Sequence, residues 1–172
     1  FEYEYEITDL LPTVPYYINV TAFDFGSPVS GLASLESPPN VNAKVTYALE
    51  SNADTALAKD MKVFVYPNPY RIEGEYRKNG YEGRGDTDRP DDRVRVVHFA
   101  NLPPKCMIRI YTIDGDLVRE VVHDIPVSDP LSNHDYWDLI TRNTQLAVSG
   151  LYYWTVEGDD GNVQIGKLVL IL

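Results

Sequence analysis

The sequence predicts an all-β protein built as an antiparallel β-sandwich. Thirteen tyrosines and twelve prolines stand against only two methionines, a composition that suits pleated sheets joined by proline-punctuated loops. Apolar residues recur with a period of two in short runs, separated by turn signals such as Asp114-Gly115 and Asp160-Gly161-Asn162. The only helix candidate is the short segment from Ala53 to Lys62, where Asp54 could cap one turn.

Charge and composition exclude several classes of partner. The chain carries 15 basic and 26 acidic side chains and a net charge of −11, which argues against a nucleic-acid surface or binding to anionic lipid. No stretch approaches the roughly 18 apolar residues of a membrane span. Cys106 is the single cysteine, so an internal disulfide and a cysteine-rich zinc site are both excluded.

Residues 1–50 form the first predicted unit. Its signal is clearest over residues 1–37, which contain the spacing Leu10-x-Pro12-x-x-x-Tyr16-x-Ile18-x-Val20-x-Ala22 and then Gly31-Leu32-Ala33-Ser34. This pattern resembles the last three strands of a fibronectin type III domain, including its tyrosine corner. An ordinary β-hairpin is the alternative. Three strands cannot close a two-sheet sandwich, so either further strands belong to this unit or its strands pack on the neighbouring domain.

Residues 51–60 are interpreted as a linker, with the boundary near Lys59, and residues 61–172 as the second unit. Seven strands are predicted there: Lys62 to Tyr66, Arg93 to Phe99, Lys105 to Thr112, Asp116 to His123, Tyr136 to Thr141, Leu151 to Glu157 and Val163 to Leu172. Short strands with this punctuation are typical of an immunoglobulin-like sandwich. The apolar run that ends at Leu172 must be buried, because an exposed run would invite aggregation. We therefore expect the last strand to belong to the core, and the chain to be the tail of a larger protein.

An ordered set of landmarks runs through the second unit. The set is Val65-Tyr66-Pro67-Asn68-Pro69, Phe99-Ala100-Asn101-Leu102-Pro103, Ile108-Arg109-Ile110-Tyr111, Asp114-Gly115, Tyr136-Trp137-Asp138, Ser149-Gly150-Leu151-Tyr152 and Gly166-Lys167-Leu168-Val169. In order and spacing it resembles the carboxyl-terminal sorting domains of type IX secretion cargo, and equally the immunoglobulin-like domain of flagellar hook-capping proteins. The resemblance covers about 110 residues.

The resemblance implies a function in export. Sorting domains are recognised at the outer membrane and carry a passenger through the translocon, after which they are often removed. The residues that match the sorting pattern here are Pro67, Asn68, Pro69, Gly150, Tyr152, Gly166 and Lys167. Each also has a structural interpretation, such as fixed backbone angles at the prolines. The chain departs from the pattern in a long insertion, residues 70–92, and in lacking a glycine after Trp137-Asp138.

The insertion holds two further motifs. Arg84-Gly85-Asp86 is the tripeptide of integrin-type adhesion, although chance explains most such matches. Asp86, Asp88, Asp91 and Asp92 are candidate calcium ligands, because Ca²⁺ prefers carboxylate oxygens. Three arginines nearby favour a solvated, salt-bridged loop instead, and we expect no other metal or cofactor.

No catalytic residue is predicted. His98, His123 and His134 are far apart in the sequence, Cys106 alternates with core residues, and neither a nucleophile elbow nor a phosphate-binding loop appears. We expect a non-catalytic module of a larger exported protein, secreted or at the cell surface, whose partner is the outer-membrane secretion machinery. The alternative is a retained structural or adhesive module that joins neighbouring subunits of a surface assembly by β-strand addition. Glycan binding through exposed aromatic faces is a third hypothesis.

Overall fold

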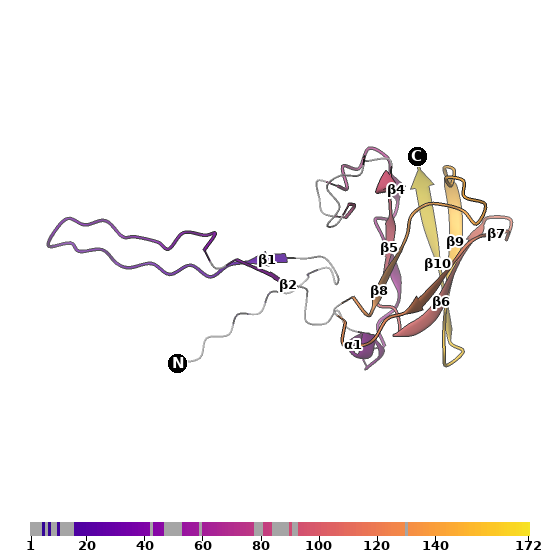
Figure 1. The fold of residues 1–172 in the computed structure, drawn as a ribbon, viewed down its shortest axis with the longest axis horizontal. Helices are drawn as coiled ribbons and strands as arrows, with labels where there is room; N and C mark the ends of the chain where they lie inside the picture. Colours follow the sequence, from indigo (N-terminus) through magenta and orange to yellow (C-terminus); the bar gives the residue numbers. More distant parts are fainter. Residues whose placement is uncertain are drawn as a thin grey trace.

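The computed structural model describes residues 5, 7, 10, 16–41, 43–46, 53–58, 60–77, 81–83, 90, 93–129 and 131–172. It confirms the predicted all-β sandwich: two facing sheets with almost no helix (Figure 1). The larger sheet has the order β4-β10-β9-β6-β7 and the smaller one β3-β5-β8. Their strands are β3 (Phe64–Tyr66), β4 (Tyr70–Arg71), β5 (Val97–Ala100), β6 (Lys105–Thr112), β7 (Leu117–Asp124), β8 (His134–Trp137), β9 (Gly150–Gly158) and β10 (Val163–Ile171).

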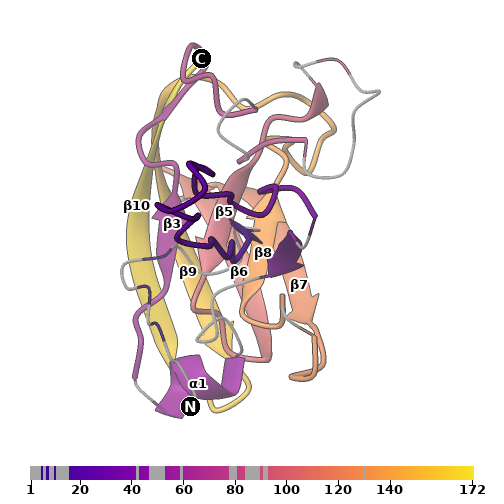
Figure 2. The same cartoon turned by 90° about the vertical axis from the view of Figure 1, so that its left-hand side faces the viewer.

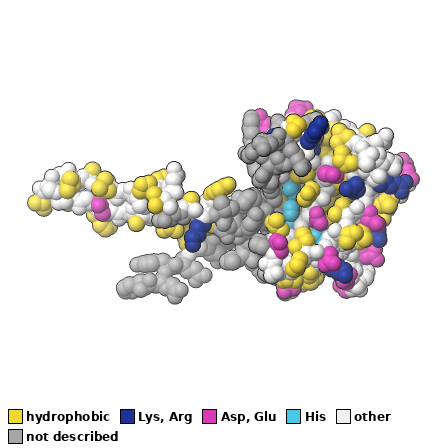
Figure 3. Space-filling model, in the orientation of Figure 1, with side chains coloured by type: hydrophobic (Ala, Val, Ile, Leu, Met, Phe, Trp, Pro, Cys, Tyr) yellow, Lys and Arg dark blue, Asp and Glu magenta, His cyan; other side chains and the backbone are white. Residues whose placement is uncertain are grey.

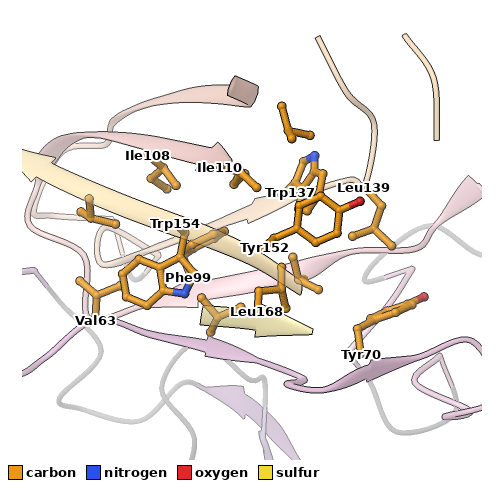
Figure 4. Close-up of a cluster of buried hydrophobic side chains, with 14 of the residues drawn as sticks. Val63, Tyr70, Phe99, Ile108, Ile110, Trp137, Leu139, Tyr152, Trp154 and Leu168 are labelled. Atoms are coloured by element: carbon orange, nitrogen blue, oxygen red, sulfur yellow. The ribbon is translucent and has the colours of Figure 1, made fainter. Parts of the chain in front are cut away.

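The core lies between the two sheets and follows the period-two pattern of the sequence. In β6, Ile108 and Ile110 are fully buried, and across the ladder they face Val156 and Trp154 of β9. Leu168 of β10 is also fully buried. Figure 4 shows how side chains from both sheets meet in this cluster. The apolar run at the end of the chain is therefore a core strand, as its composition predicts.

A short helix, α1 (Ala53–Ala58), precedes the sandwich and lies at the end where β9 turns into β10 (Figure 2). Its backbone is tied to the sandwich by the Ala53 N–H, which donates to Ser132 Oγ at 3.1 Å. The helix ends with Met61 N–H donating to Ala56 O at 2.9 Å, while Asp60 takes a left-handed backbone with φ of 48°. The segment after α1 then runs up beside β10 to β3.

Residues 16–46 form a two-stranded ribbon that stands apart from the sandwich (Figure 1). Strands β1 (Tyr16–Ile18) and β2 (Lys44–Thr46) close its base, and Ser27 pairs with Leu32 near its tip. Apolar side chains are spaced along the ribbon (Figure 3), and Phe25 and Val29 are 89% and 100% exposed. The predicted tyrosine corner involves Pro12, which lies outside the described residues.

Two strands differ from the sequence prediction. Strand β8 begins at His134, earlier than expected, and ends at Trp137, because Leu139 adopts a left-handed φ of 58° that no strand accommodates. Strand β4 was not predicted at all; its two residues pair in parallel with β10, Tyr70 opposite Leu170. A parallel pair leaves no hairpin signal in the sequence, because its two strands are distant along the chain.

Candidate recognition site

The side chain of Asn68 is hydrogen-bonded to the edge of β10. Its Nδ2 donates to Lys167 O at 2.8 Å, and its Oδ1 accepts from the Val169 N–H at 3.2 Å. A primary amide has one donor side and one acceptor side, as a peptide group does, so Asn68 acts as one more residue of a neighbouring strand. Strand β4 follows directly and continues the pairing, and the Ile72 N–H donates to Ile171 O at 2.9 Å. The Pro-Asn-Pro segment thus connects the two sheets and holds the last strand.

The prolines on either side of Asn68 shape this connection. The Tyr66–Pro67 and Asn68–Pro69 peptide bonds are both cis. The Tyr76 hydroxyl donates to Pro69 O at 3.3 Å and accepts from the Arg71 N–H at 3.2 Å. The first residues of the insertion therefore fold back and fix the end of the Pro-Asn-Pro segment.

Gly166 allows the indole of Trp154 to lie directly against β10. A β-carbon at this position would stand 2.1 Å from Trp154 Cζ2, far inside van der Waals contact. Trp154 is 5% exposed and meets Phe99 edge-on, with ring centroids 5.8 Å apart (Figure 4). The ring therefore has little room to retreat, so the glycine is a steric requirement of the core.

Gly150 and Tyr152 occupy the start of β9, next to β10. Tyr152 is buried; its hydroxyl donates to Val148 O at 2.7 Å and its ring meets Trp137 edge-on. Burial raises the pKa of the Tyr152 hydroxyl. A β-carbon on Gly150 would come no closer than 3.8 Å to any atom considered, the ring of Tyr152, which is an ordinary contact. Packing therefore explains why position 152 is a tyrosine, but it does not explain why position 150 is a glycine.

Five of the seven sequence-predicted residues lie at one edge of the larger sheet, and the other two, Gly150 and Tyr152, lie on the adjacent central strand β9. The seven lie on the β3–β4 connection, on β10 and on β9, and the ladder sets Gly166 opposite Trp154 and Leu170 opposite Gly150. We call the exposed members Asn68, Pro69, Gly150 and Lys167 the edge patch. The patch joins residues about 100 positions apart and exists only when the sandwich is folded.

The insertion is anchored at its centre by buried polar side chains. The Tyr70 hydroxyl donates to Glu82 Oε1 at 2.6 Å, and Glu82 is only 8% exposed. Burial, and then the neighbouring carboxylate, raise the pKa of Tyr70 far above its ordinary value. Asp86, Asp88, Asp91 and Asp92, the calcium candidates, and the Arg84-Gly85-Asp86 tripeptide lie outside the described residues.

A histidine pair that the sequence did not indicate joins the insertion to the smaller sheet. His98 Nδ1 lies 2.9 Å from His134 Nε2, and His98 Nε2 lies 2.5 Å from Tyr81 O. Because a carbonyl only accepts, His98 carries its proton on Nε2; its Nδ1 in the neutral ring then accepts from His134. Both rings are buried, and Tyr66 stacks on His98. The contact could not be predicted from the sequence, because it depends on β5 and β8 being neighbouring strands of one sheet.

The remaining reactive side chains have structural roles. Cys106 is buried in the core, where burial raises the pKa of its thiol to about 12. His123 is fully buried between Ser132 O, at 2.8 Å from its Nε2, and Asp135 Oδ2, at 3.1 Å from its Nδ1. Among the described residues, no group of three or more His, Cys, Asp or Glu side chains is arranged to hold a metal ion. Within the same residues, no helix is long and apolar enough to cross a membrane.

Comparison with known proteins places the chain near two solved structures. One is PorZ, described as an essential bacterial surface component of the type IX secretion system of Porphyromonas gingivalis, with 18% identity and a TM-score of 0.47. The other is dimeric latent PorU from the same organism, with 15% identity and a TM-score of 0.40. The matches cover 74% and 81% of this chain but only 14% and 11% of those proteins. No protein-family model and no curated protein matches the sequence.

Proposed function

We propose that residues 61–172 are a non-catalytic sorting module that directs a larger protein to the cell surface or the medium. The proposal rests first on the ordered set of landmarks that resembles type IX sorting domains. The observation that carries it is the edge patch, because the seven residues that match the sorting pattern lie on the β3–β4 connection and on the adjacent strands β10 and β9, and four of them are exposed. A receptor that binds this patch would bind only a folded domain. Because the sorting domains that the chain resembles are recognised at the outer membrane, the outer-membrane secretion machinery is the proposed partner.

Lys167 is the strongest candidate for a direct contact with that machinery. Its side chain is exposed on the outer face of β10, whereas its carbonyl holds Asn68. Replacing the side chain therefore removes a charge without touching the backbone pairing. In a bacterium with a type IX system, a reporter fused to this chain is expected to lose most of its export when Lys167→Gln is introduced.

The matched control is Lys105→Gln, which removes an exposed lysine from β6 of the same sheet. Lys105 lies 3.9 Å from Asp124 and 4.0 Å from Asp159, and surface ion pairs of this kind contribute on the order of 0.5 kcal/mol. Both variants should keep the melting temperature of the wild type within a few degrees. Export of the folded Lys167→Gln variant at the wild-type level would contradict the proposal.

A permanent structural role is the second candidate, and the ribbon favours it. Tyr17, Val20 and Phe25 are 79%, 81% and 89% exposed, and an isolated two-stranded ribbon is only marginally stable in water. In a surface assembly, further strands would cover it. Export would then tolerate Lys167→Gln, and the mature extracellular protein would retain residues 61–172, which its intact mass would reveal.

A further inference from the structure

A groove of about 510 Å³ runs along the lower half of β10. One wall is α1 and the segment after it, with Leu57 and Met61; the other is β10 itself, with Val163 and Ile165; Asn101 also lines it. Figure 2 shows α1 beside the lower end of β10, where this groove lies. It is separate from the edge patch, whose one residue on β10, Lys167, lies further along the strand than Ile165.

The backbone of β10 that borders this groove has no pairing strand among the described residues. Asn68 bonds to Lys167 O and to the Val169 N–H, so odd-numbered residues of β10 direct their backbone groups away from β9. Because a strand alternates with period two, the N–H and C=O of Val163 and Ile165 also point outward. The Val63 N–H, in the segment between α1 and β3, bonds to the Gln164 side chain and not to the β10 backbone, at 2.8 Å. Among the residues that the structure describes, this edge of β10 is therefore paired by β4 and Asn68 in its upper part and has no backbone partner in its lower part.

The chemistry of the groove defines what would fill it. Outward backbone donors and acceptors spaced two residues apart match an extended polypeptide, which adds to a sheet edge as one more strand. Val163 and Ile165 are 52% and 70% exposed, and Leu57 is 54% exposed, so apolar side chains flank the position. Asp60 and Asp160 also line the groove, and Lys62 is the one basic side chain among its described lining residues. In a chain with a net charge of −11, this balance favours a strand with basic residues.

We propose that the lower edge of β10 is a docking site for an extended, basic and apolar segment of a partner protein, bound by β-strand addition. The new strand continues, end to end, the pairing that β4 and Asn68 already make on the upper half of this edge. The site does not depend on the edge patch or on export, so the two proposals can fail separately.

The first test measures binding of a defined peptide to the full 172-residue chain. The probe is a fluorescein-labelled peptide, acetyl-Lys-Val-Thr-Val-Lys-Val-Thr-amide, followed by fluorescence anisotropy. The acidic analogue, with both lysines replaced by glutamate, should bind at least about tenfold more weakly, because Asp60 and Asp160 repel it. Failure of the wild-type chain to bind the basic peptide, or equal binding of both peptides, overturns the proposal.

The decisive variant is Ile165→Pro, which removes an outward N–H and blocks the edge. Proline is tolerated at an edge position whose N–H faces away from the sheet. The matched control is Val122→Pro at the opposite edge of the same sheet: Val118 O accepts from the Arg142 N–H, so by the period of two Val122 also points outward. Ile165→Pro should weaken peptide binding by at least about tenfold and Val122→Pro by less than about twofold. Equal effects of the two variants overturn the proposal.

Two further measurements keep the test decisive. If Ile165→Pro does not fold, hydrogen exchange on the wild-type chain replaces it: the amides of Val163 and Ile165 should exchange at least about tenfold more slowly with peptide bound. Unchanged exchange overturns the proposal.

The double variant Asp60→Asn, Asp160→Asn should weaken binding of the basic peptide several-fold. An asparagine at position 160 keeps a side-chain oxygen that can accept from the Asn162 N–H in the β9–β10 turn. If the chain instead associates with itself and Ile165→Pro abolishes only that association, the occupant is a second copy, and a basic partner segment is excluded.

Discussion

The side-chain amide of Asn68 and the carbonyl of Lys167 are hydrogen-bonded at 2.8 Å although 99 residues separate them. This contact joins the first landmark of the sandwich domain to its last. It replaces a backbone partner at the upper edge of β10, where the chain would otherwise leave polar groups unpaired. The register of β10 itself is set by its pairing with β9, from Val163 opposite Glu157 to Leu170 opposite Gly150.

Removing the Asn68 amide should loosen the upper edge of β10. We expect Asn68→Ala to lower the free energy of unfolding by about 1–2 kcal/mol, since two exposed hydrogen bonds are lost, and to speed exchange of the Val169 amide. Asn143→Ala is the control, because no side-chain hydrogen bond of Asn143 occurs among the described residues. Chemical denaturation and hydrogen exchange measure both effects. A Val169 amide that exchanges at the wild-type rate in Asn68→Ala would refute the role of the contact.

The two motif glycines should respond differently to alanine. Gly166→Ala places a methyl group against Trp154 and should cost about 1–3 kcal/mol through overpacking. Gly150→Ala meets only an ordinary contact with Tyr152, so its effect on stability should stay within about 0.5 kcal/mol. Thermal denaturation of both variants makes the comparison. An export defect in the stable Gly150→Ala variant would report recognition rather than folding, whereas similar melting temperatures for both variants would contradict the packing argument.

The buried thiol of Cys106 should make stability depend on alkaline pH. In the folded chain burial raises its pKa to about 12, whereas an unfolded thiol titrates near about 8.5. Between these values the unfolded state loses the proton and the folded state keeps it, so the free energy of unfolding falls as pH rises from about 9 to 12. Cys106→Val should show a shallower fall over this range. Modification by iodoacetamide at pH 8 should be at least roughly a hundredfold slower than for a free thiol; rapid modification of the native chain would show that the site is open.

Glu82 should hold the insertion on the sandwich. Glu82→Ala deletes the acceptor for the Tyr70 hydroxyl and leaves that buried donor unsatisfied, a local loss of about 1–3 kcal/mol. We expect limited proteolysis to cut residues 70–92 several-fold faster in this variant. Glu82→Gln, which keeps an acceptor oxygen, should remain close to the wild type. Equal cleavage of all three proteins would show that the insertion is held by other contacts.

Local patterns in the sequence were sufficient for four of the five strands of the larger sheet, all except β4. The predicted bounds of β6 are the observed ones, β7 and β9 differ by one residue at each end, and β10 differs by one residue at its last position only. Buried positions alternate along β6 and β9, as a sheet with one buried face requires, and glycine-containing turns form the β6–β7 and β9–β10 hairpins. Alternation also predicted that Cys106 would be buried.

Only the tertiary structure decided how distant segments meet. The order of the strands brought His98 to His134, the parallel strand β4 to β10, and the amide of Asn68 to Lys167. The seven site residues could be selected by resemblance, but their position on adjacent segments of the larger sheet could not be predicted. Alternation is a relation between neighbours along the chain, so it can be recognised in the sequence. Pairing between strands depends on how both sheets pack around a common core, and this packing cannot be predicted from a local pattern.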